Sequence, residues 1–419
     1  MKAIITAAAC AACIALPRTP VLGAQEHWTQ FRAHASNNAV IGGNLKVQWE
    51  VVTDGRISAS PTFAHGTLFI GTNAGTLYAI HAANGQVVWK HHVANALMSA
   101  PLVYRGLVIA GEGNAGSPYG HDVGPAHVGS GESALIAFDE KTGVIRWRAL
   151  LRGSGMPTPA IVSGVLVHHD GSGRITGMDP MTGRLLYERR VHSVASMSAA
   201  VPIEKTRFVT AGVLHNAVLK VDAKTGAVIW RSNPFPEHAS GIGDCPPATD
   251  GRRVYGEYVV SETSGAHVEI GENVREHAYA LDAQTGKLVW DAALQSGPLP
   301  IRNESGIPVV HNGVLYVGGA AAPWVSAIDA KTGHVLWKKQ IYGPVKGAFA
   351  LKRGALYFGD FAGYLWALDA RTGKKLGVKP MSTSFNVGSP IIVGKTLVIG
   401  SLTGSVFAVP LQAIREANL

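Results

Sequence analysis

Charged and amide side chains concentrate at three points in the second half of the chain. Asp244 is the first, Arg302, Asn303 and Glu304 follow together, and Lys346 is the third. A carboxylate with a perturbed pKa can exchange protons with a substrate, so Asp244 and Glu304 are the candidate catalytic residues. Arg302, Asn303 and Lys346 could bind an anionic or metal-bearing ligand. The same charges could instead neutralise one another in an ion-pair network, and the sequence leaves both alternatives open.

The histidines and the lone mature cysteine offer weaker patterns. His91–His92 and His168–His169 are adjacent pairs in predicted strands, where neighbouring residues point to opposite faces, so neither pair can easily chelate one ion. His238 could form a mixed site with Asp244 and Cys245, but no recognised ligand spacing links them. The sequence has no CxxCH motif, so we expect no covalently attached haem c, and it has no GxSxG, HExxH or P-loop motif.

The elements that must position these residues are copies of one repeat. Its pattern is an apolar residue followed by Asp-x-x-Thr-Gly-x-x-x-Trp, in which Asp can accept bonds from backbone amides and Gly suits a tight turn. Short strands of apolar and β-branched residues flank each turn. Apart from two longer intervals, successive turns lie about 40–47 residues apart, the length of a four-stranded propeller blade. The copies end at Trp89, Trp147, Tyr187, Trp230, Trp290, Trp337 and Gly377.

The number of copies predicts a closed ring. Seven copies carry the turn, and an eighth, at residues 386–409, stops after its third strand. Leu45–Val51, with Trp49 at the expected place, can supply the missing outer strand from the other end of the chain, which removes an exposed sheet edge. The sequence therefore predicts an all-β fold, an eight-bladed β-propeller of four-stranded antiparallel blades. It would form one domain over residues 44–419, preceded by an N-terminal extension at 25–43.

The N-terminus has the pattern of a secretory signal peptide. A basic residue precedes the apolar stretch Ala3–Leu16, and small residues precede a cleavage site near Ala24. We expect residues 1–24 to be removed and the mature chain to reside in the periplasm or outside the cell. Cys10 and Cys13 lie in this segment, and both lack the Leu expected three residues before a lipidated Cys. The chain would associate with a membrane only if one of them were lipidated.

Composition narrows the class of partner. Charged residues make up 16% of the chain, and the formal net charge is +9. Lys and Arg are scattered through the repeats without a run or stripe, so we expect a soluble basic surface and no nucleic-acid partner. We also expect a monomer.

Two insertions lengthen the repeat, and both are rich in polar residues. The first runs from Gly111 to Ser133 and the second from Glu257 to His277. Long polar loops on a rigid ring are frequent functional elements, although repeat proteins also tolerate extra length without a function. We expect a protein partner or a small ligand to bind on the face that carries them. Their ionisable residues include Glu112, His121, Asp122, His127, Glu132, Glu262, His267, Glu269, Glu272 and Glu276.

The repeat resembles that of propellers of the pyrroloquinoline quinone (PQQ) type. Trp28-Thr29-Gln30-Phe31-Arg32 is similar to the Trp-x-x-Phe-Arg opening of many members. The resemblance covers nearly the whole mature chain and implies the fold. Members differ in function, since they include quinoprotein alcohol dehydrogenases and the propeller lipoprotein of outer-membrane β-barrel assembly.

A quinoprotein dehydrogenase would use PQQ and calcium, and the resemblance implies which residues would bind calcium and act as the catalytic base. Glu112, within Gly111–Gly113, is similar to a carboxylate that binds calcium, and Glu304 stands in a place comparable to the catalytic base. The adjacent cysteine pair of many such enzymes is missing. Phe361 occupies the position of an Arg or Lys that contacts the quinone, although Lys346 could replace it.

Two hypotheses of function follow from these observations. The first is a secreted or periplasmic platform that binds a protein or ligand. The second is a PQQ- and calcium-dependent dehydrogenase that oxidises a small alcohol or sugar. We favour the platform by a small margin, because the quinone-binding set is incomplete.

Overall fold

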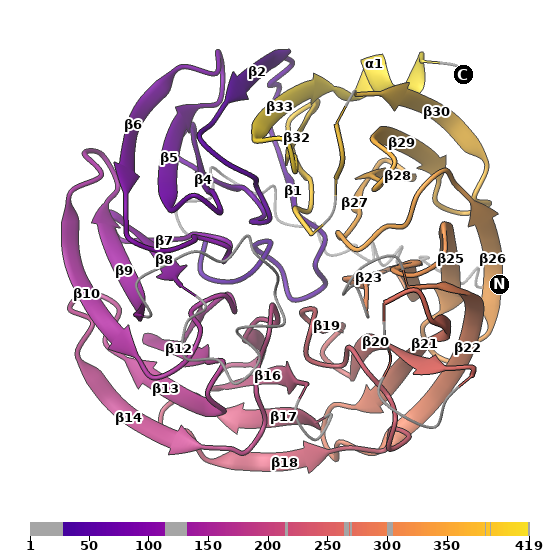
Figure 1. Cartoon of the computed structure of the whole chain (residues 1–419), viewed down its shortest axis with the longest axis horizontal. Coiled ribbons are helices and arrows are strands. Elements are labelled where there is room, and N and C mark those ends of the chain that lie inside the picture. Colours follow the sequence, from indigo (N-terminus) through magenta and orange to yellow (C-terminus); the bar gives the residue numbers. More distant parts are fainter. Residues whose placement is uncertain are drawn as a thin grey trace, which may run out of the picture.

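The chain folds into a ring of β-sheets. The computed structural model describes residues 28–113, 132–213, 217–263, 268, 270–299, 305–381, 383–385 and 387–417. Within these ranges eight sheets radiate from a central axis like the blades of a propeller (Figure 1). The predicted eight-bladed β-propeller is confirmed.

The first four blades each contain four antiparallel strands in sequence order. Blade 1 contains β3 (Thr62–Ala64), β4 (Thr67–Gly71), β5 (Thr76–His81) and β6 (Val87–His92), and blade 2 contains β7 (Leu102–Tyr104), β8 (Leu107–Glu112), β9 (Ser133–Asp139) and β10 (Ile145–Leu151). Blade 3 contains β11 (Ala160–Val162), β12 (Val165–His169), β13 (Arg174–Met178) and β14 (Leu185–Arg190), and blade 4 contains β15 (Val201–Glu204), β16 (Arg207–Gly212), β17 (Ala217–Asp222) and β18 (Val228–Ser232).

The later blades follow the same plan, and blade 5 has the longest strands. Blade 5 contains β19 (Ala248–Thr249), β20 (Arg253–Ser261), β21 (Asn273–Asp282) and β22 (Leu288–Pro298). Blade 6 contains β23 (Val309–His311), β24 (Val314–Gly318), β25 (Trp324–Asp329) and β26 (Val335–Gln340), and blade 7 contains β27 (Ala350–Lys352), β28 (Ala355–Gly359), β29 (Tyr364–Asp369) and β30 (Lys375–Pro380). Blade 8 contributes β31 (Ile391–Val393), β32 (Thr396–Gly400) and β33 (Ser405–Pro410).

The two ends of the chain meet in blade 8. β2 (Trp49–Val52) pairs antiparallel with β33, with Trp49 opposite Ala408, and so supplies the outer strand that the sequence predicted. A second N-terminal strand, β1 (Val40–Ile41), pairs in parallel with β31 on the inner side, which makes this sheet five-stranded. Indigo and yellow ribbons therefore lie side by side in Figure 1. Repeat length alone could not reveal the inner strand, because it has no counterpart in the other blades.

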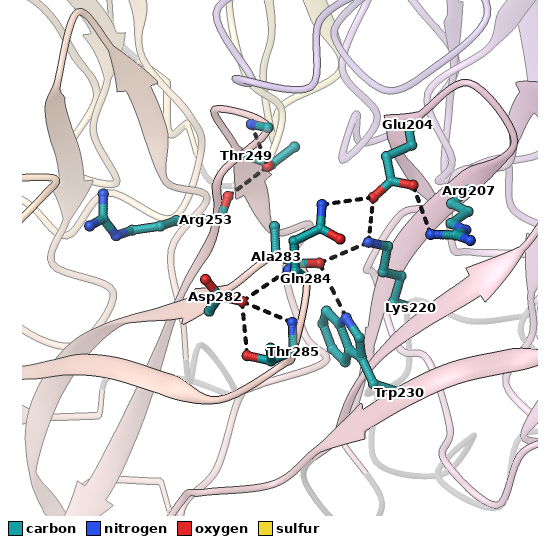
Figure 2. Close-up of polar contacts among 11 residues, drawn as sticks. Glu204, Arg207, Lys220, Trp230, Thr249, Arg253, Asp282, Ala283, Gln284 and Thr285 are labelled. Atoms are coloured by element: carbon teal, nitrogen blue, oxygen red, sulfur yellow. Dashed lines mark hydrogen bonds and ion pairs between the residues drawn. The ribbon is translucent and has the colours of Figure 1, made fainter.

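The Asp-x-x-Thr-Gly turns hold each blade to its neighbour, as Figure 2 shows for blades 4 and 5. One carboxylate oxygen of Asp282 accepts hydrogen bonds from the backbone and hydroxyl of Thr285, both at 2.8 Å. Gly286 then turns the chain with φ of 71°. The Trp230 indole of blade 4 donates a 3.2 Å bond to the Ala283 carbonyl of this turn. The same contact to the following blade is made by Trp49, Trp89, Trp147, Tyr187, Trp290 and Trp337.

The joint between blades 7 and 8 is built differently. Blade 7 carries Gly377 where the other blades have Trp or Tyr, and the C-terminal helix α1 (Leu411–Arg415) packs there. A Cβ added at Gly377 would lie 2.2 Å from the carbonyl oxygen of Ile414. The Val378 amide also donates to the Ala417 carbonyl at 3.0 Å. The C-terminal segment thus takes the space of the missing aromatic side chain.

The hydrophobic core lies between neighbouring blades. Its largest cluster joins blades 4 to 7 through side chains such as Val209, Val254, Val325 and Leu356, which are fully buried, and it includes Phe31. Burial of such apolar faces is the main driving force that assembles a propeller. None of the helices in the described ranges is long and apolar enough to cross a membrane.

Candidate functional site

Residues 28–41, here called the N-terminal strap, run around the axis of the ring (Figure 1). This is the described part of the segment that the sequence assigned to an extension at 25–43. The strap bonds to the innermost strands of blades 2, 3, 5, 6, 7 and 8. Its partners in that order are Val103, Ile161, Thr249, Val310, Leu351 and Ile392.

Arg32 is the polar centre of the strap. Its side chain is fully buried and donates bonds to the carbonyls of Asn37 at 2.7 Å, Pro390 at 2.6 Å and Phe349 at 2.7 Å. Burial lowers the pKa of the guanidinium to about 9, so it still carries its charge at neutral pH. Because these carbonyls belong to the strap and to the openings of blades 7 and 8, one side chain fixes three segments on the axis.

Little space remains on the axis. A cavity of about 10 Å³ lies beside the strap, lined by Phe31, Ser60, Met98, Met156 and Met197 among others. A volume of this size holds about one water molecule. This cavity beside the strap is therefore much smaller than a planar quinone.

The structure brings together two of the predicted site residues, Asp244 and Lys346. They come from the openings of blades 5 and 7, and their side chains form a buried ion pair. Asp244 also accepts a 3.3 Å bond from the Ser196 hydroxyl. These two charges thus neutralise each other, which was one of the alternatives that the sequence left open. The other residues of the predicted cluster, Arg302, Asn303 and Glu304, lie outside the described residues.

Glu112, the metal ligand implied by the resemblance, lies at the end of β8 and is buried. Its two carboxylate oxygens accept bonds from the Asn95 amide at 3.2 Å and from the Arg148 guanidinium at 3.1 Å. In the parts of the chain that the structure describes, no three His, Cys, Asp or Glu side chains gather as a metal site. Glu112 is therefore held in an ion pair with Arg148, and its role as a metal ligand stays a prediction. The insertion residues 114–131 lie outside the described ranges.

The buried histidines and Cys245 have local partners. His169 lies between the Thr210 hydroxyl at 3.1 Å and the Ser193 carbonyl at 2.6 Å. His168 bonds to the Pro157 carbonyl at 3.0 Å, and burial lowers its pKa to about 4, so it is neutral at neutral pH. The Cys245 thiol donates to a carbonyl, and burial raises its pKa, which keeps it a protonated, poor nucleophile.

The sequence did not single out Glu257 as a site residue, although it stands at the start of the second insertion. Glu257 on β20 and Glu276 on β21 lie on the same face of a hairpin, because Glu257 pairs with Ala278 and Val259 pairs with Glu276. Both side chains are buried between blades 5 and 6, with exposed fractions of 7% and 4%. Two carboxyl groups are thus placed as diagonal neighbours away from solvent.

The two carboxyl groups differ in their partners. Glu276 accepts amide bonds from Ala321 at 2.7 Å and Ala322 at 3.2 Å, and the Gln295 amide also donates to it. Glu257 accepts one bond, at 3.2 Å from the Gly306 amide. Burial raises the pKa of Glu276 to about 7, and burial followed by the charge of Glu276 raises the pKa of Glu257 well above its usual value. The pair therefore resists being doubly ionised.

Comparison with known proteins places this geometry in a family. A family model described as outer membrane protein assembly factor BamB matches residues 38–215 and 274–413. Tetrathionate hydrolase of Acidithiobacillus ferrooxidans is 25% identical over 372 residues, which cover 85% of this chain and 73% of that protein. BamB of Burkholderia pseudomallei is 22% identical over 393 residues, 93% of this chain and 88% of the relative.

Two solved structures share the fold. BamB from Moraxella catarrhalis has a TM-score of 0.65 at 15% identity and covers 87% of this chain and 98% of that one. Quinohemoprotein alcohol dehydrogenase from Comamonas testosteroni has a TM-score of 0.63 at 12% identity, with coverages of 92% and 80%. The resemblance inferred from the repeat is confirmed: the chain belongs to the family of PQQ-type propellers described as outer membrane protein assembly factor BamB.

Proposed function

We propose that this chain is a periplasmic or secreted platform that binds a protein partner on the face bearing the two insertions. The observation that carries the proposal is the occupied axis. The strap and the Asp244–Lys346 ion pair occupy the space between the blade openings, and the cavity beside them is small, so we expect a partner to bind on a rim of the ring. Family membership supports this function, because the matching family is named for an assembly factor.

Blade 5 offers a projecting surface for such a partner. Its strands β20, β21 and β22 have 9, 10 and 11 residues, whereas the second to fourth strands of blade 6 have 5 or 6. The projecting part is polar, with Glu262 and Arg275 in an ion pair of 2.6 Å, and Ile270 nearby is 61% exposed. A hairpin whose described residues expose Ile270 among polar side chains suits recognition of a folded protein.

The dehydrogenase alternative has less support. It would need room for the quinone and the carboxylate of Glu112 free for calcium, and the described residues around Glu112 and the strap offer neither as they are arranged here. Glu112 is engaged by Arg148, and Asp244 by Lys346. If PQQ bound, it would supply the redox chemistry, and these residues would first have to exchange their present partners.

A crosslinking experiment tests the platform. A photoreactive residue at Ile270 should capture a partner in the native periplasm, whereas one at Asn84, in the exposed β5–β6 turn of blade 1 at the opposite end of the strands, should not. The captured protein, once identified and purified, should bind the mature chain in calorimetry, and shortening the β20–β21 hairpin should abolish this binding. Equal capture from both positions would contradict the proposal.

A cofactor titration separates the two functions. The mature chain should show no saturable change in PQQ absorbance and no rise in melting temperature with PQQ, either with or without calcium. Tight, calcium-dependent PQQ binding would make the dehydrogenase the better account. If the same preparation hydrolysed tetrathionate, the chain would share the activity for which its hydrolase relative is named. It would then not be a purely non-catalytic platform.

A further inference from the structure

An acidic residue recurs at one place in the propeller repeat. In blades 2, 5 and 7 it directly follows a Gly of the second strand, as Glu112, Glu257 and Asp360. Glu112 is held by Arg148, and Asp360 accepts hydrogen bonds on both oxygens. In Glu257 only Oε2 accepts a bond, from Gly306, and Oε1 has no hydrogen-bond partner among the described residues. A carboxylate oxygen without a hydrogen-bond partner, in a side chain that is only 7% exposed, lowers the stability of the fold unless a ligand or a proton satisfies it.

The backbone opposite Glu257 leaves room and supplies a further oxygen. A Cβ added at Gly306 would lie 2.9 Å from Oε2 of Glu257 and also 2.9 Å from the carbonyl oxygen of Gly318. A Cβ at Gly319 would lie 3.1 Å from Oε2 of Glu276. Gly306 thus faces the carboxylate of Glu257 and Gly319 that of Glu276, and a side chain at either position would crowd the carboxylate beside it.

The donor set indicates the kind of ligand. Carboxylate and carbonyl oxygens without nitrogen or sulfur are what hard cations prefer, and calcium tolerates an irregular shell completed by water. The nearby Cys245 thiol donates its hydrogen to the Ser305 carbonyl and is not offered as a ligand. The positive charge of Lys338 acts on Glu276, but its ammonium group donates to the Leu294 carbonyl at 2.8 Å, and no ion pair with either glutamate is described, so an ion could still neutralise them.

We propose that Glu257 and Glu276 bind a calcium-type divalent cation between blades 5 and 6. The ion takes the unsatisfied Oε1 of Glu257 and ties the long hairpin of blade 5 to the glycine-rich strand end of blade 6. This site is distinct from Glu112 of blade 2, and it does not depend on the platform function. Because the ion replaces a proton on the carboxyl pair, its affinity rises with pH.

Titration of the metal-free mature chain with calcium tests the site. We expect one ion to bind per chain with a Kd of about 10⁻⁴–10⁻³ M, the range of extracellular calcium modules. Glu257→Gln and Glu276→Gln should each weaken calcium binding by at least about tenfold. Loss of a residue that only supports a metal ligand already weakens metal affinity by about this factor. Asp360→Asn is the matched control, because it alters a buried acid at the same repeat position whose oxygens are already bonded.

Terbium luminescence gives a readout that does not depend on how well the glutamate variants fold. Burial, and then the charge of Glu257, raise the pKa of the Tyr279 phenol, which indicates that this ring lies near the carboxylate. Terbium bound at the site should be sensitised by Tyr279 and displaced by calcium. Tyr279→Phe should reduce the terbium emission while calcium affinity stays within about twofold of wild type. This change is much smaller than the tenfold loss expected for the two glutamate variants.

The proposal fails if the wild-type chain shows no saturable binding of calcium or terbium at millimolar concentrations. It also fails if binding occurs but neither glutamine variant weakens it, since the ion would then occupy another site. In both cases the two glutamates would simply share a proton or hold an ordered water. A PQQ titration that is negative while calcium alone binds would support the site and leave the platform function unaffected.

Discussion

The carboxylate of Asp244 forms a buried ion pair with the ammonium group of Lys346, and this pair joins the openings of blades 5 and 7. The two residues are far apart in the sequence, so the contact exists only after the ring has formed. Ion pairs removed from water gain little net stability, but each charge becomes very unfavourable when its partner is lost. The pair therefore enforces a specific arrangement of the blade openings.

Removing one member of this pair should cost more than removing both. Lys346→Met should lower the free energy of unfolding by about 3–5 kcal/mol, because it leaves Asp244 buried without its counter-charge. The Asp244→Asn/Lys346→Met double variant should lose clearly less than the sum of the single variants. Denaturant unfolding of the three variants checks this double-mutant cycle, and strictly additive losses would contradict it. Arg146→Met, which breaks an exposed pair with Asp139, should cost no more than about 1 kcal/mol.

Replacing Arg32 should release the strap from the axis. Arg32→Met leaves the carbonyls of Asn37, Phe349 and Pro390 without their donor, so the free energy of unfolding should fall by at least about 3 kcal/mol. Limited proteolysis should then cut within residues 28–41, whereas the wild-type strap should resist cleavage. Arg371→Met changes an exposed arginine and should leave the cleavage pattern as it is. Unchanged resistance in the Arg32 variant would mean that the backbone bonds alone hold the strap.

The C-terminal helix should be interchangeable with an aromatic side chain at the joint between blades 7 and 8. A chain that ends at Pro410 loses the buried Ile414 and the bond to Val378, and we expect a loss of about 2–4 kcal/mol. Gly377→Trp should destabilise the full-length chain by about 1–3 kcal/mol, because the new side chain meets the helix backbone. The same substitution should restore part of the stability of the shortened chain.

Thermal unfolding of the four combinations of these two changes provides the check. We expect Gly377→Trp to destabilise the full-length chain and to stabilise the chain that ends at Pro410. If the substitution destabilises both chains equally, the helix is not a replacement for the repeat's aromatic residue.

Acid should destabilise the fold through His168. Its pKa is about 4 in the folded chain and near 6.5 when unfolded, so the unfolded state binds the extra proton between these values. The stability contributed by the neutral imidazole is complete above pH 6.5 and is lost as the pH falls towards 4. Each pKa unit between the folded and unfolded states changes the free energy of unfolding by about 1.4 kcal/mol, so the full change on acidification is about 3 kcal/mol.

Urea unfolding at pH 7, 5.5 and 4.5 measures this dependence. His168→Gln should be less stable than wild type at pH 7, and the difference should narrow on acidification. His81→Gln, at an exposed position, should leave the pH profile unchanged. A constant gap between wild type and the His168 variant would contradict the assignment.

The blades were predictable from sequence because each is specified locally. The Asp-x-x-Thr-Gly turn carries its own hydrogen bonds, as Asp282 and Thr285 show, and the Trp that follows it finds its partner in the next turn. Ring closure was predictable for the same reason, since Trp49 marks the missing outer strand. These features repeat at a regular interval, and a regular interval can be counted.

The candidate site was only partly predictable. Asp244 and Lys346 were recognised as deviations from the repeat, but their pairing depends on the spacing of blades across the ring. Glu257 and Glu276 come together through the register of a single long hairpin, and a one-residue slip would turn one of them to the other face. The course of the strap was not predictable, because residues 28–41 contact six blades in turn and have no periodicity of their own.

The contribution of residues 28–52 to blade 8 and to the axis has a consequence for how the molecule folds. β2 lies far ahead of β33 in the chain, and neither strand has its partner until the seven blades between them have brought them together. Until then the strap has no complete ring to bind, and both edges of an unfinished propeller expose unpaired strands. Contacts between residues so far apart in the chain slow folding. A chain of this design must therefore be kept from aggregating until the ring closes, and a molecule that loses β2 or β33 by proteolysis reverts to the same vulnerable state.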